Sequence, residues 1–150
     1  MVKVLYAGSF DPITRGHADI IERAGGMFDL VVGVGLNADK NCMFNVSDRV
    51  ELIKTVFPDL NVVWYNGLTA DYCKNNGIDY LIRGIRSAAD LEYEKEVERF
   101  NSEHGVETIY LMAKPEYCNV SSTKVRNAIK NGRLDELERL VPKSIINKII

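Results

Sequence analysis

The sequence contains few cysteines and histidines. Its 150 residues include three cysteines and two histidines. Cys42, Cys73 and Cys118 form an odd number with wide spacing, and no CxxC or Cys/His pattern for a metal occurs. These features argue against a disulfide framework and predict three reduced thiols in a reducing compartment. We therefore expect a cytoplasmic protein.

Segments that direct or anchor a protein to a membrane are also missing. No apolar stretch approaches the roughly 20 residues of a membrane span. After Met1 only a short apolar run precedes Gly8, so nothing resembles a signal peptide. The formal net charge is −2, and the lack of a basic excess argues weakly against a dedicated nucleic-acid binder. We expect no membrane and no nucleic-acid partner.

What the chain does have is the composition of a globular domain. Its hydrophobic fraction of 46% and charged fraction of 27% are ordinary values. A length of 150 residues is enough to bury a core. No internal repeat or interdomain linker interrupts the sequence. We predict a single domain over residues 1–150.

Five short apolar runs alternate with segments of helical periodicity. Runs with little polar alternation are typical of strands covered on both faces. The predicted strands are 2–7, 30–36, 61–65, 80–82 and 108–112, and the predicted helices are 18–28, 47–57, 69–76, 87–104, 122–131, 134–140 and one starting at Pro142. Ser47 is the expected cap of its helix. This order predicts an α/β protein with a doubly wound, five-stranded parallel sheet and C-terminal helices.

The segment 8–17, GSFDPITRGH, joins the first predicted strand to the first predicted helix. A strand, a turn of Gly, Ser and Pro, and a helix start form an anion site, because free backbone N–H groups point out of the helix end. In this turn His17 would lie beside a bound phosphate as a proton donor. The alternative is an ordinary strand-to-helix loop with a surface histidine.

A pair of arginines follows the predicted strand 80–82. Arg83 and Arg86 flank Gly84, and an arginine binds phosphate through two parallel hydrogen bonds. The alternative is a pair of solvated surface arginines. It is the less favoured one, because the preceding strand fixes where the two residues lie.

Two further motifs follow other strands. Segment 119–126, NVSSTKVR, puts three consecutive hydroxyl residues at a helix start, and Lys40 ends the segment 37–40 after the second strand. Their alternatives are a helix cap with spare serines and a solvated loop lysine. The carboxyl ends of parallel strands meet at one edge of the sheet, where such folds bind ligands. The four motifs together therefore predict a phosphate-binding site.

These motifs resemble those of the nucleotidyltransferase superfamily. The likeness rests on segments 8–17, 82–86 (IRGIR) and 120–123 (VSST). Segments 40–44 (KNCMF) and 90–94 (DLEYE) are similar to motifs of the phosphopantetheine adenylyltransferase family, as is Thr14 in place of the first histidine of HxGH. The resemblance runs from Lys3 to at least Arg126 and implies a Rossmann-like nucleotidyltransferase fold.

The resemblance also implies an activity. Members of this family transfer AMP from ATP to 4′-phosphopantetheine, giving dephospho-coenzyme A and pyrophosphate in coenzyme A biosynthesis. The attacking phosphate oxygen is already anionic, so we expect direct in-line attack without a covalent enzyme intermediate. Mg²⁺ is expected as the cofactor, with few or no dedicated protein ligands. A homohexamer is implied, and residues 93–100 and Ile145, Ile146, Ile149 and Ile150 are candidates for its contact surface.

The resemblance assigns roles residue by residue. The expected catalytic residues are His17, Lys40 and Arg83. The expected phosphopantetheine-binding residues are Ser9, Lys40, Thr69 and Arg83, although Thr69 replaces a common Leu or Met. The expected ATP-binding residues are Ser9, Phe10, His17, Gly84, Ile85, Arg86, Glu94, Tyr117, Cys118, Asn119, Val120, Ser121, Ser122 and Thr123. No residue is assigned as a metal ligand.

Two other functions remain open at this point. A sister nucleotidyltransferase would act on nicotinate mononucleotide or glycerol phosphate, and Thr14 together with the pair Arg83 and Arg86 argues against it. A non-catalytic module that senses a nucleotide or coenzyme A could use the same fold. The intact set of His17, Lys40, Arg83 and Ser122 argues against such a sensor.

Overall fold

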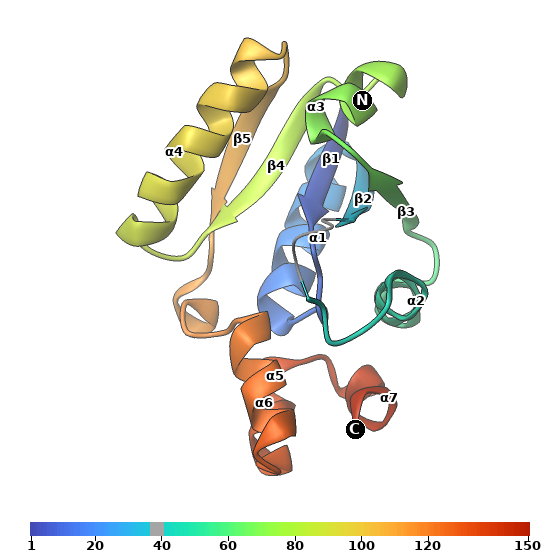
Figure 1. Cartoon of the computed structure of the whole chain (residues 1–150), viewed down its shortest axis with the longest axis vertical. Coiled ribbons are helices and arrows are strands. Elements are labelled where there is room, and N and C mark those ends of the chain that lie inside the picture. Colours follow the sequence, from blue (N-terminus) through green and yellow to red (C-terminus); the bar gives the residue numbers. More distant parts are fainter. Residues whose placement is uncertain (37–40) are drawn as a thin grey trace.

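Five parallel strands form the centre of the molecule. The computed structural model describes residues 1–36 and 41–150. The strands are β1 (Lys3–Gly8), β2 (Asp29–Leu36), β3 (Asn61–Asn66), β4 (Tyr80–Ile85) and β5 (Glu107–Met112), in the spatial order β3-β2-β1-β4-β5 (Figure 1). Every neighbouring pair is parallel. The predicted doubly wound, five-stranded parallel sheet is therefore confirmed.

Helices connect the strands and follow the last one. The longer helices are α1 (Arg15–Met27), α2 (Val46–Val56), α3 (Thr69–Asn75), α4 (Ala88–Glu103) and α5 (Ser122–Lys130). The chain ends in α6 (Leu137–Leu140) and α7 (Ile146–Ile149), with 3₁₀ turns η1 (Pro115–Tyr117), η2 (Leu134–Glu136) and η3 (Lys143–Ile145). None of the helices in the described part of the chain is long and apolar enough to cross a membrane.

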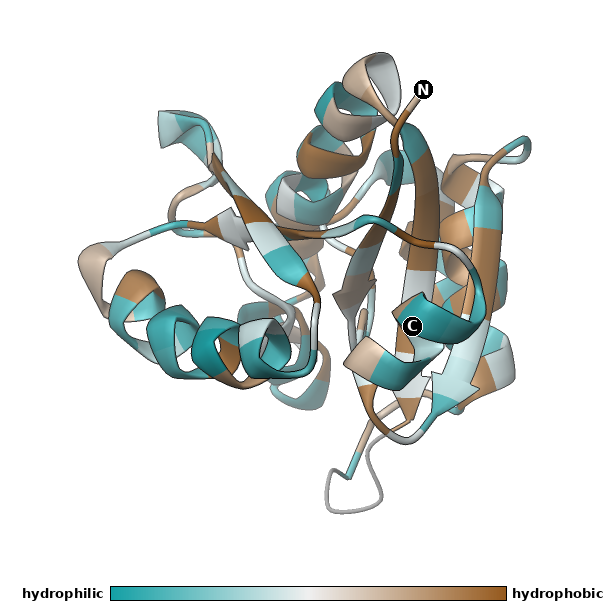
Figure 2. Cartoon of the chain, turned by 90° about the horizontal axis from the view of Figure 1, so that it is seen from above, coloured by the Kyte–Doolittle hydropathy of each residue, from teal (hydrophilic) through white to brown (hydrophobic). Residues whose placement is uncertain are grey.

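Both faces of the sheet are covered, because successive side chains of a strand point to opposite faces. In β1, Val4 and Tyr6 join a core with α1, α2, α5 and the C-terminal helices. Leu5 and Ala7 join a second core with α3 on the other face. In Figure 2 the strands carry long hydrophobic stretches, whereas much of the helical surface is hydrophilic. This two-sided burial explains why the strands read as continuous apolar runs.

Several boundaries differ from those predicted. Helix α1 begins at Arg15, so His17 lies in its first turn and not in the preceding loop. Thr14 caps this helix, and its side chain and that of His17 form a reciprocal capping box. The predicted cap Ser47 is wrong: the Asn45 side chain caps α2 by accepting from the Asp48 N–H at 2.7 Å.

The predicted strand 80–82 continues to Ile85, so Arg83 lies within β4 and not after it. Ile82 directly before it and Ile85 two positions after it are buried, so the apolar run continues beyond the arginine. The C-terminal isoleucines also differ from expectation, because Ile145 and Ile149 are 0% and 5% exposed in the core. These two residues are not available as a contact surface.

Truncating the centre of the sheet should destabilise the fold strongly. Leu81 is 1% exposed and packs in the core beneath α3. Leu81→Ala should lower the free energy of unfolding by about 2–5 kcal/mol, measured by urea denaturation. The matched variant Leu134→Ala removes a side chain that is 45% exposed, and it should cost less than about 1 kcal/mol. Equal losses in the two variants would contradict this packing.

Candidate active site: two adjoining cavities

A first cavity of about 360 Å³ opens where β1 and β4 end and α5 begins. Its walls come from the segment after β1, the end of β4, the start of α4 and the start of α5. The lining residues are Tyr6, Ala7, Gly8, Ser9, Phe10, Asp11, Thr14, Gly16, His17, Ile20, Arg83, Gly84, Arg86, Asp90, Tyr93, Glu94, Ala113, Tyr117, Val120, Ser121, Ser122, Thr123 and Arg126. The predicted gathering of motifs at this edge of the sheet is therefore present for the described ones.

A second cavity of about 540 Å³ adjoins the first. It is lined by Ala7, Gly8, Ser9, Gly35, Leu36, Tyr65, Asn66, Gly67, Thr69, Arg83, Tyr93 and Val97. Ala7, Gly8, Ser9, Arg83 and Tyr93 line both cavities. Two ligands bound in these cavities would meet at this shared wall.

His17 lines the first cavity, and one of its two imidazole nitrogens is already engaged by the protein. Its Nδ1 accepts a hydrogen bond from the Thr14 backbone N–H at 3.0 Å, and the Thr14 hydroxyl lies 3.2 Å from the same atom. In the neutral ring Nδ1 is therefore the acceptor and Nε2 carries the proton. Burial, helped by the positive charges of Arg86 and Arg83, lowers the pKa of His17 from 6.5 to about 4. At neutral pH this residue is a neutral hydrogen-bond donor.

The ring of Phe10 packs against the imidazole of His17. It is 2% exposed, and its ring centre lies 4.9 Å from that of His17 and 5.2 Å from that of Tyr6, with edge-to-face geometry in both pairs. Its φ of 48° is unusual for a residue with a side chain. Such strained backbone persists only where the surrounding packing imposes it, and it is concentrated at functional sites. The three packed rings fix the place of His17.

Arg83 is held at the shared wall by a buried carboxylate. Its Nε and Nη2 donate to the two carboxylate oxygens of Glu94 at 3.1 and 2.7 Å, and Nη1 donates to the Ala7 carbonyl at 2.9 Å. Burial opposes the charge on Arg83, but the hydrogen bonds and the charge of Glu94 outweigh it and raise the pKa of Arg83. The guanidinium is thus charged and fixed before any ligand binds.

The start of α5 supplies hydroxyl groups to the first cavity. Ser121 caps the helix by accepting from the Lys124 N–H at 3.2 Å, and the Ser122 hydroxyl donates to the Pro12 carbonyl at 2.7 Å. Thr123 accepts from Arg126 at 3.1 Å. Arg86 donates to the Val120 carbonyl at 3.0 Å. A helix start with these donors and cations favours the phosphates of a nucleotide.

Similar proteins from other organisms cover nearly all of the chain. A phosphopantetheine adenylyltransferase from Flavobacterium psychrophilum is 41% identical over 150 residues, covering 97% of this chain and 98% of that protein. One from Clostridium botulinum is 40% identical over 152 residues, covering 97% and 94% of the two chains. A family model described as cytidylyltransferase-like matches residues 5–128. The chain belongs to the phosphopantetheine adenylyltransferase family.

Solved structures with low sequence identity have the same fold. Thermotoga maritima TmcAL bound with alpha-thio ATP has a TM-score of 0.66 at 11% identity, over 99% of this chain and 55% of that one. A bifunctional NMN adenylyltransferase/ADP ribose pyrophosphatase from Francisella tularensis, complexed with AMP and a manganese ion, has a TM-score of 0.61 at 15% identity, over 96% and 44% of the two chains. These likenesses support the fold class alone.

The structure brings most of the site residues implied by the phosphopantetheine adenylyltransferase family to the two cavities, but not all of them. Thr69, the first residue of α3, lines the second cavity, and its hydroxyl lies 2.8 Å from that of Tyr65. Lys40 lies outside the described residues. Ile85, Cys118 and Asn119 line neither of these two cavities, whereas the other expected residues in the described part of the chain line at least one of them.

Three other polar residues lie at or beside the cavities, and the sequence motifs assign no role to them. Arg126 and Asp11 both line the first cavity, and Arg126 donates to the Asp11 carbonyl at 2.8 Å. Arg49, on α2, is 4% exposed and donates to the Ser9 carbonyl at 2.9 Å. The sequence offers one signal for Arg49: it is a charged residue on the otherwise apolar face of α2 that carries Leu52 and Ile53.

The imidazole of His17 should resist protonation well below neutral pH. Its NMR signals should keep the values of the neutral ring down to about pH 5 and change near pH 4, since its pKa is lowered to about 4. The variant His104→Gln leaves a single histidine and so assigns the signals. In the unfolded chain His17 titrates near its usual value of about 6.5, so the free energy of unfolding should fall as pH drops from about 6.5 to about 4. A His17 transition near pH 6.5 would contradict the neutral donor.

Removing the charge of Glu94 should destabilise the protein measurably. Glu94→Gln leaves the Arg83 guanidinium without its anionic partner, and the expected loss is about 1–3 kcal/mol in urea denaturation. The matched variant on the same helix is Glu92→Gln, whose pair with Lys95 is exposed on both sides. That control should change stability by less than about 0.5 kcal/mol. If the two variants behave alike, Glu94 does not hold Arg83.

Proposed function

We propose that this chain transfers the AMP group of ATP to the 4′-phosphate of phosphopantetheine, forming dephospho-coenzyme A and pyrophosphate for coenzyme A biosynthesis. The observation that carries this proposal is the shared wall of the two cavities, where Arg83 and Ser9 face both. A direct transfer between two bound molecules needs such a meeting point. The names of the relatives supply the acceptor, phosphopantetheine, and the transferred group, adenylyl.

In the proposed reaction, an oxygen of the 4′-phosphate attacks the α-phosphorus of ATP in line. A new P–O bond forms as the bond from the α-phosphorus to the bridging oxygen breaks, and pyrophosphate leaves with that electron pair. No covalent intermediate with the enzyme is needed, because the attacking oxygen is already anionic. The protein's contribution is positioning, which can supply about 7–11 kcal/mol, and the stabilisation of charge at the α-phosphate.

Each cavity is assigned to one substrate. ATP occupies the first cavity, with its β- and γ-phosphates at the start of α5, where Ser121, Ser122 and Thr123 lie. Phosphopantetheine occupies the second, beside Thr69. Arg83 orients the attacking phosphate together with Lys40, and His17 donates its Nε2 proton to an oxygen of the α-phosphate in a hydrogen bond. The Nε2 proton is available for this role, because Nδ1 already accepts the Thr14 N–H.

We further propose Mg²⁺ as the cofactor, held by nucleotide phosphates and water. In the part of the chain that the structure describes, no group of three His, Cys, Asp or Glu side chains could hold a metal ion. The carboxylates of Asp11 and Glu94 in the first cavity already accept hydrogen bonds from N–H groups. With these carboxylates engaged, the protein would offer Mg²⁺ few ligands of its own, and the ion would supply neutralisation of phosphate charge.

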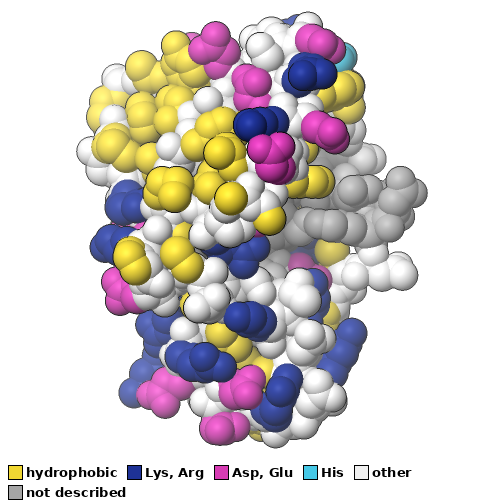
Figure 3. Space-filling model, turned by 90° about the vertical axis from the view of Figure 1, so that its left-hand side faces the viewer, with side chains coloured by type: hydrophobic (Ala, Val, Ile, Leu, Met, Phe, Trp, Pro, Cys, Tyr) yellow, Lys and Arg dark blue, Asp and Glu magenta, His cyan; other side chains and the backbone are white. Residues whose placement is uncertain are grey.

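We also propose a cytoplasmic homohexamer. The three cysteines are free thiols, as a reducing compartment favours. Hydrophobic side chains gather over the upper half of the side of the molecule that carries α4 and β5 (Figure 3). Leu91, Tyr93, Phe100 and Met112 are exposed on these two elements, and contact between subunits would bury them. Light scattering on the purified protein tests this assembly.

An acceptor comparison should identify the substrate. The purified protein should release pyrophosphate from ATP when phosphopantetheine is present, and release little with nicotinate mononucleotide, or with glycerol phosphate and CTP. Preference for another acceptor would assign a sister nucleotidyltransferase activity. Binding of ATP without pyrophosphate release under any of these conditions would instead indicate a sensor.

Replacing His17 should affect the chemical step more than substrate binding. We expect His17→Ala to lower kcat by about 10²–10³-fold with a much smaller rise in KM, as for the loss of one preorganised donor to developing charge. Steady-state kinetics with both substrates measure the effect. The variant His104→Ala, at the C-cap of α4 and outside both cavities, is the matched control and should retain normal kcat. Near-normal kcat in His17→Ala would remove His17 from the chemistry.

A further inference from the structure

Asp11 is an unexpected residue for a cavity that receives phosphates. Its carboxylate is 4% exposed, and the residue lines the first cavity. A negative charge at this place repels the triphosphate of a nucleotide, and a buried charge is costly unless it is paired. Its presence therefore requires a role that outweighs these costs.

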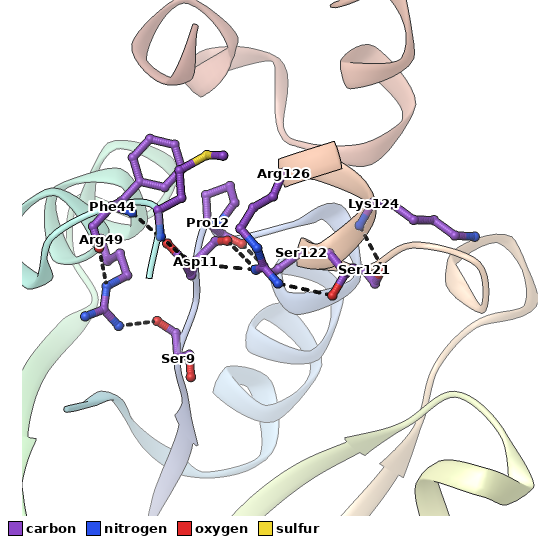
Figure 4. Close-up of polar contacts among 11 residues, drawn as sticks. Ser9, Asp11, Pro12, Phe44, Arg49, Ser121, Ser122, Lys124 and Arg126 are labelled. Carbon is purple, nitrogen blue, oxygen red and sulfur yellow. Dashed lines mark hydrogen bonds and ion pairs between the residues drawn. The ribbon is translucent and has the colours of Figure 1, made fainter. Parts of the chain in front are cut away.

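The contacts of the carboxylate indicate that role. Oδ2 and Oδ1 accept hydrogen bonds from the backbone N–H groups of Met43 and Phe44, each at 2.9 Å (Figure 4). Met43 and Phe44 are more than 30 positions away in the sequence, between β2 and α2. Both carboxylate oxygens thus fix a segment that follows another strand, β2, beside the site.

The same carboxylate reaches the opposite side of the site. Arg126 on α5 places Nη1 at 3.7 Å from Oδ2 of Asp11 and donates from the same nitrogen to the Asp11 carbonyl at 2.8 Å. Through Nη2 it donates to Thr123 at 3.1 Å. Figure 4 shows Asp11 between Phe44 on one side and Arg126 on the other.

A buried cation completes the connection. Arg49 is 4% exposed on α2 and donates to the carbonyls of Phe44 at 3.1 Å and Ser9 at 2.9 Å. The Ser122 hydroxyl donates to the Pro12 carbonyl from the α5 side. The backbone of residues 9–12 is thereby tied to both α2 and α5, with Asp11 at its centre.

We propose that Asp11 is a positioning residue that binds Met43–Phe44 on one side and Arg126 on the other, and thereby holds the cavity-lining residues 9–11 in place. Asp11 binds no phosphate, since its charge has the wrong sign. We assign it no metal, since both of its oxygens accept backbone N–H groups and the positive charge of Arg126 lies beside them. This inference rests on the proposed transferase function, and it adds a residue to which that function assigns no role.

Asp11→Asn tests the proposal directly. An amide offers only one acceptor oxygen and turns an NH₂ group toward one of the two N–H groups, so that hydrogen bond is lost together with the ion pair. We expect kcat/KM to fall at least about tenfold for both ATP and phosphopantetheine, because small displacements of positioning groups are costly. The amides of Met43 and Phe44 should exchange hydrogen faster, while the Mg²⁺ concentration for half-maximal activity stays the same.

The matched control is Asp79→Asn. Asp79 also accepts a backbone N–H from a distant segment, that of Lys3 at 3.2 Å, but it precedes β4 at the opposite edge of the sheet. This variant should retain normal kcat/KM. If Asp11→Asn does not fold, Arg126→Lys keeps the charge but loses the two-point contact with Asp11 and Thr123, and it should raise KM for ATP at least about fivefold.

Three results with the aspartate variants would overturn the proposal. They are normal kcat/KM and normal amide exchange in Asp11→Asn, a raised Mg²⁺ requirement in that variant, which would make Asp11 a metal ligand, and an equal loss in Asp79→Asn. Normal KM for ATP in Arg126→Lys would do the same. A wild-type protein without transferase activity would defeat the proposed function instead, and the exchange of the Met43 and Phe44 amides would still test the anchoring by Asp11.

Discussion

The pairing of β1 with β4 is the constraint on which the site depends. In this parallel pair Tyr6 lies opposite Ile82, so the chain leaves β1 next to Arg83. The hydrogen bond from Arg83 to the Ala7 carbonyl follows from that register. Both cavities use this junction as their common wall. A shift of one residue in the register would turn Arg83 to the other face of the sheet.

The second requirement is electrostatic. Two substrates that carry phosphates repel each other. The site must offset this repulsion with charges that are already in place when the reaction occurs. Arg83, Arg86 and Arg126 are each held by a carboxylate and a backbone carbonyl before a ligand arrives. Preorganised charges of this kind cost no reorganisation in the transition state. In Figure 3 basic side chains are prominent over the lower half of the molecule, where α5 and α6 lie.

Much of the fold could be predicted from the sequence. The five apolar runs identified the strands, because burial on both faces of a parallel sheet leaves a continuous apolar signal. The ends of the elements could not be predicted as closely. Arg83 interrupts the apolar run of β4, so the predicted strand lacks the last three residues of β4. Likewise His17 was expected in a loop, although the side chain of Thr14 begins α1 before it. Capping depends on side-chain geometry that a residue pattern does not contain.

The candidate site could be predicted only in part. Motifs located the residues that follow strands, since topology brings strand ends together. Contacts between distant segments could not be inferred in this way: Glu94 reads as one charge in an exposed run, and its burial against Arg83 depends on how α4 packs beside β5. Asp11 reads as a turn residue, and its partners Met43, Phe44 and Arg126 come from two other parts of the chain.

A crystal structure with phosphopantetheine and a non-hydrolysable ATP analogue tests the central claim most directly. The account predicts one ligand in each cavity, with the 4′-phosphate oxygen about 3–3.5 Å from the α-phosphorus. Nε2 of His17 should lie within about 3.2 Å of an α-phosphate oxygen. Two ligands that compete for the same cavity, or an α-phosphate out of reach of His17, would contradict the account.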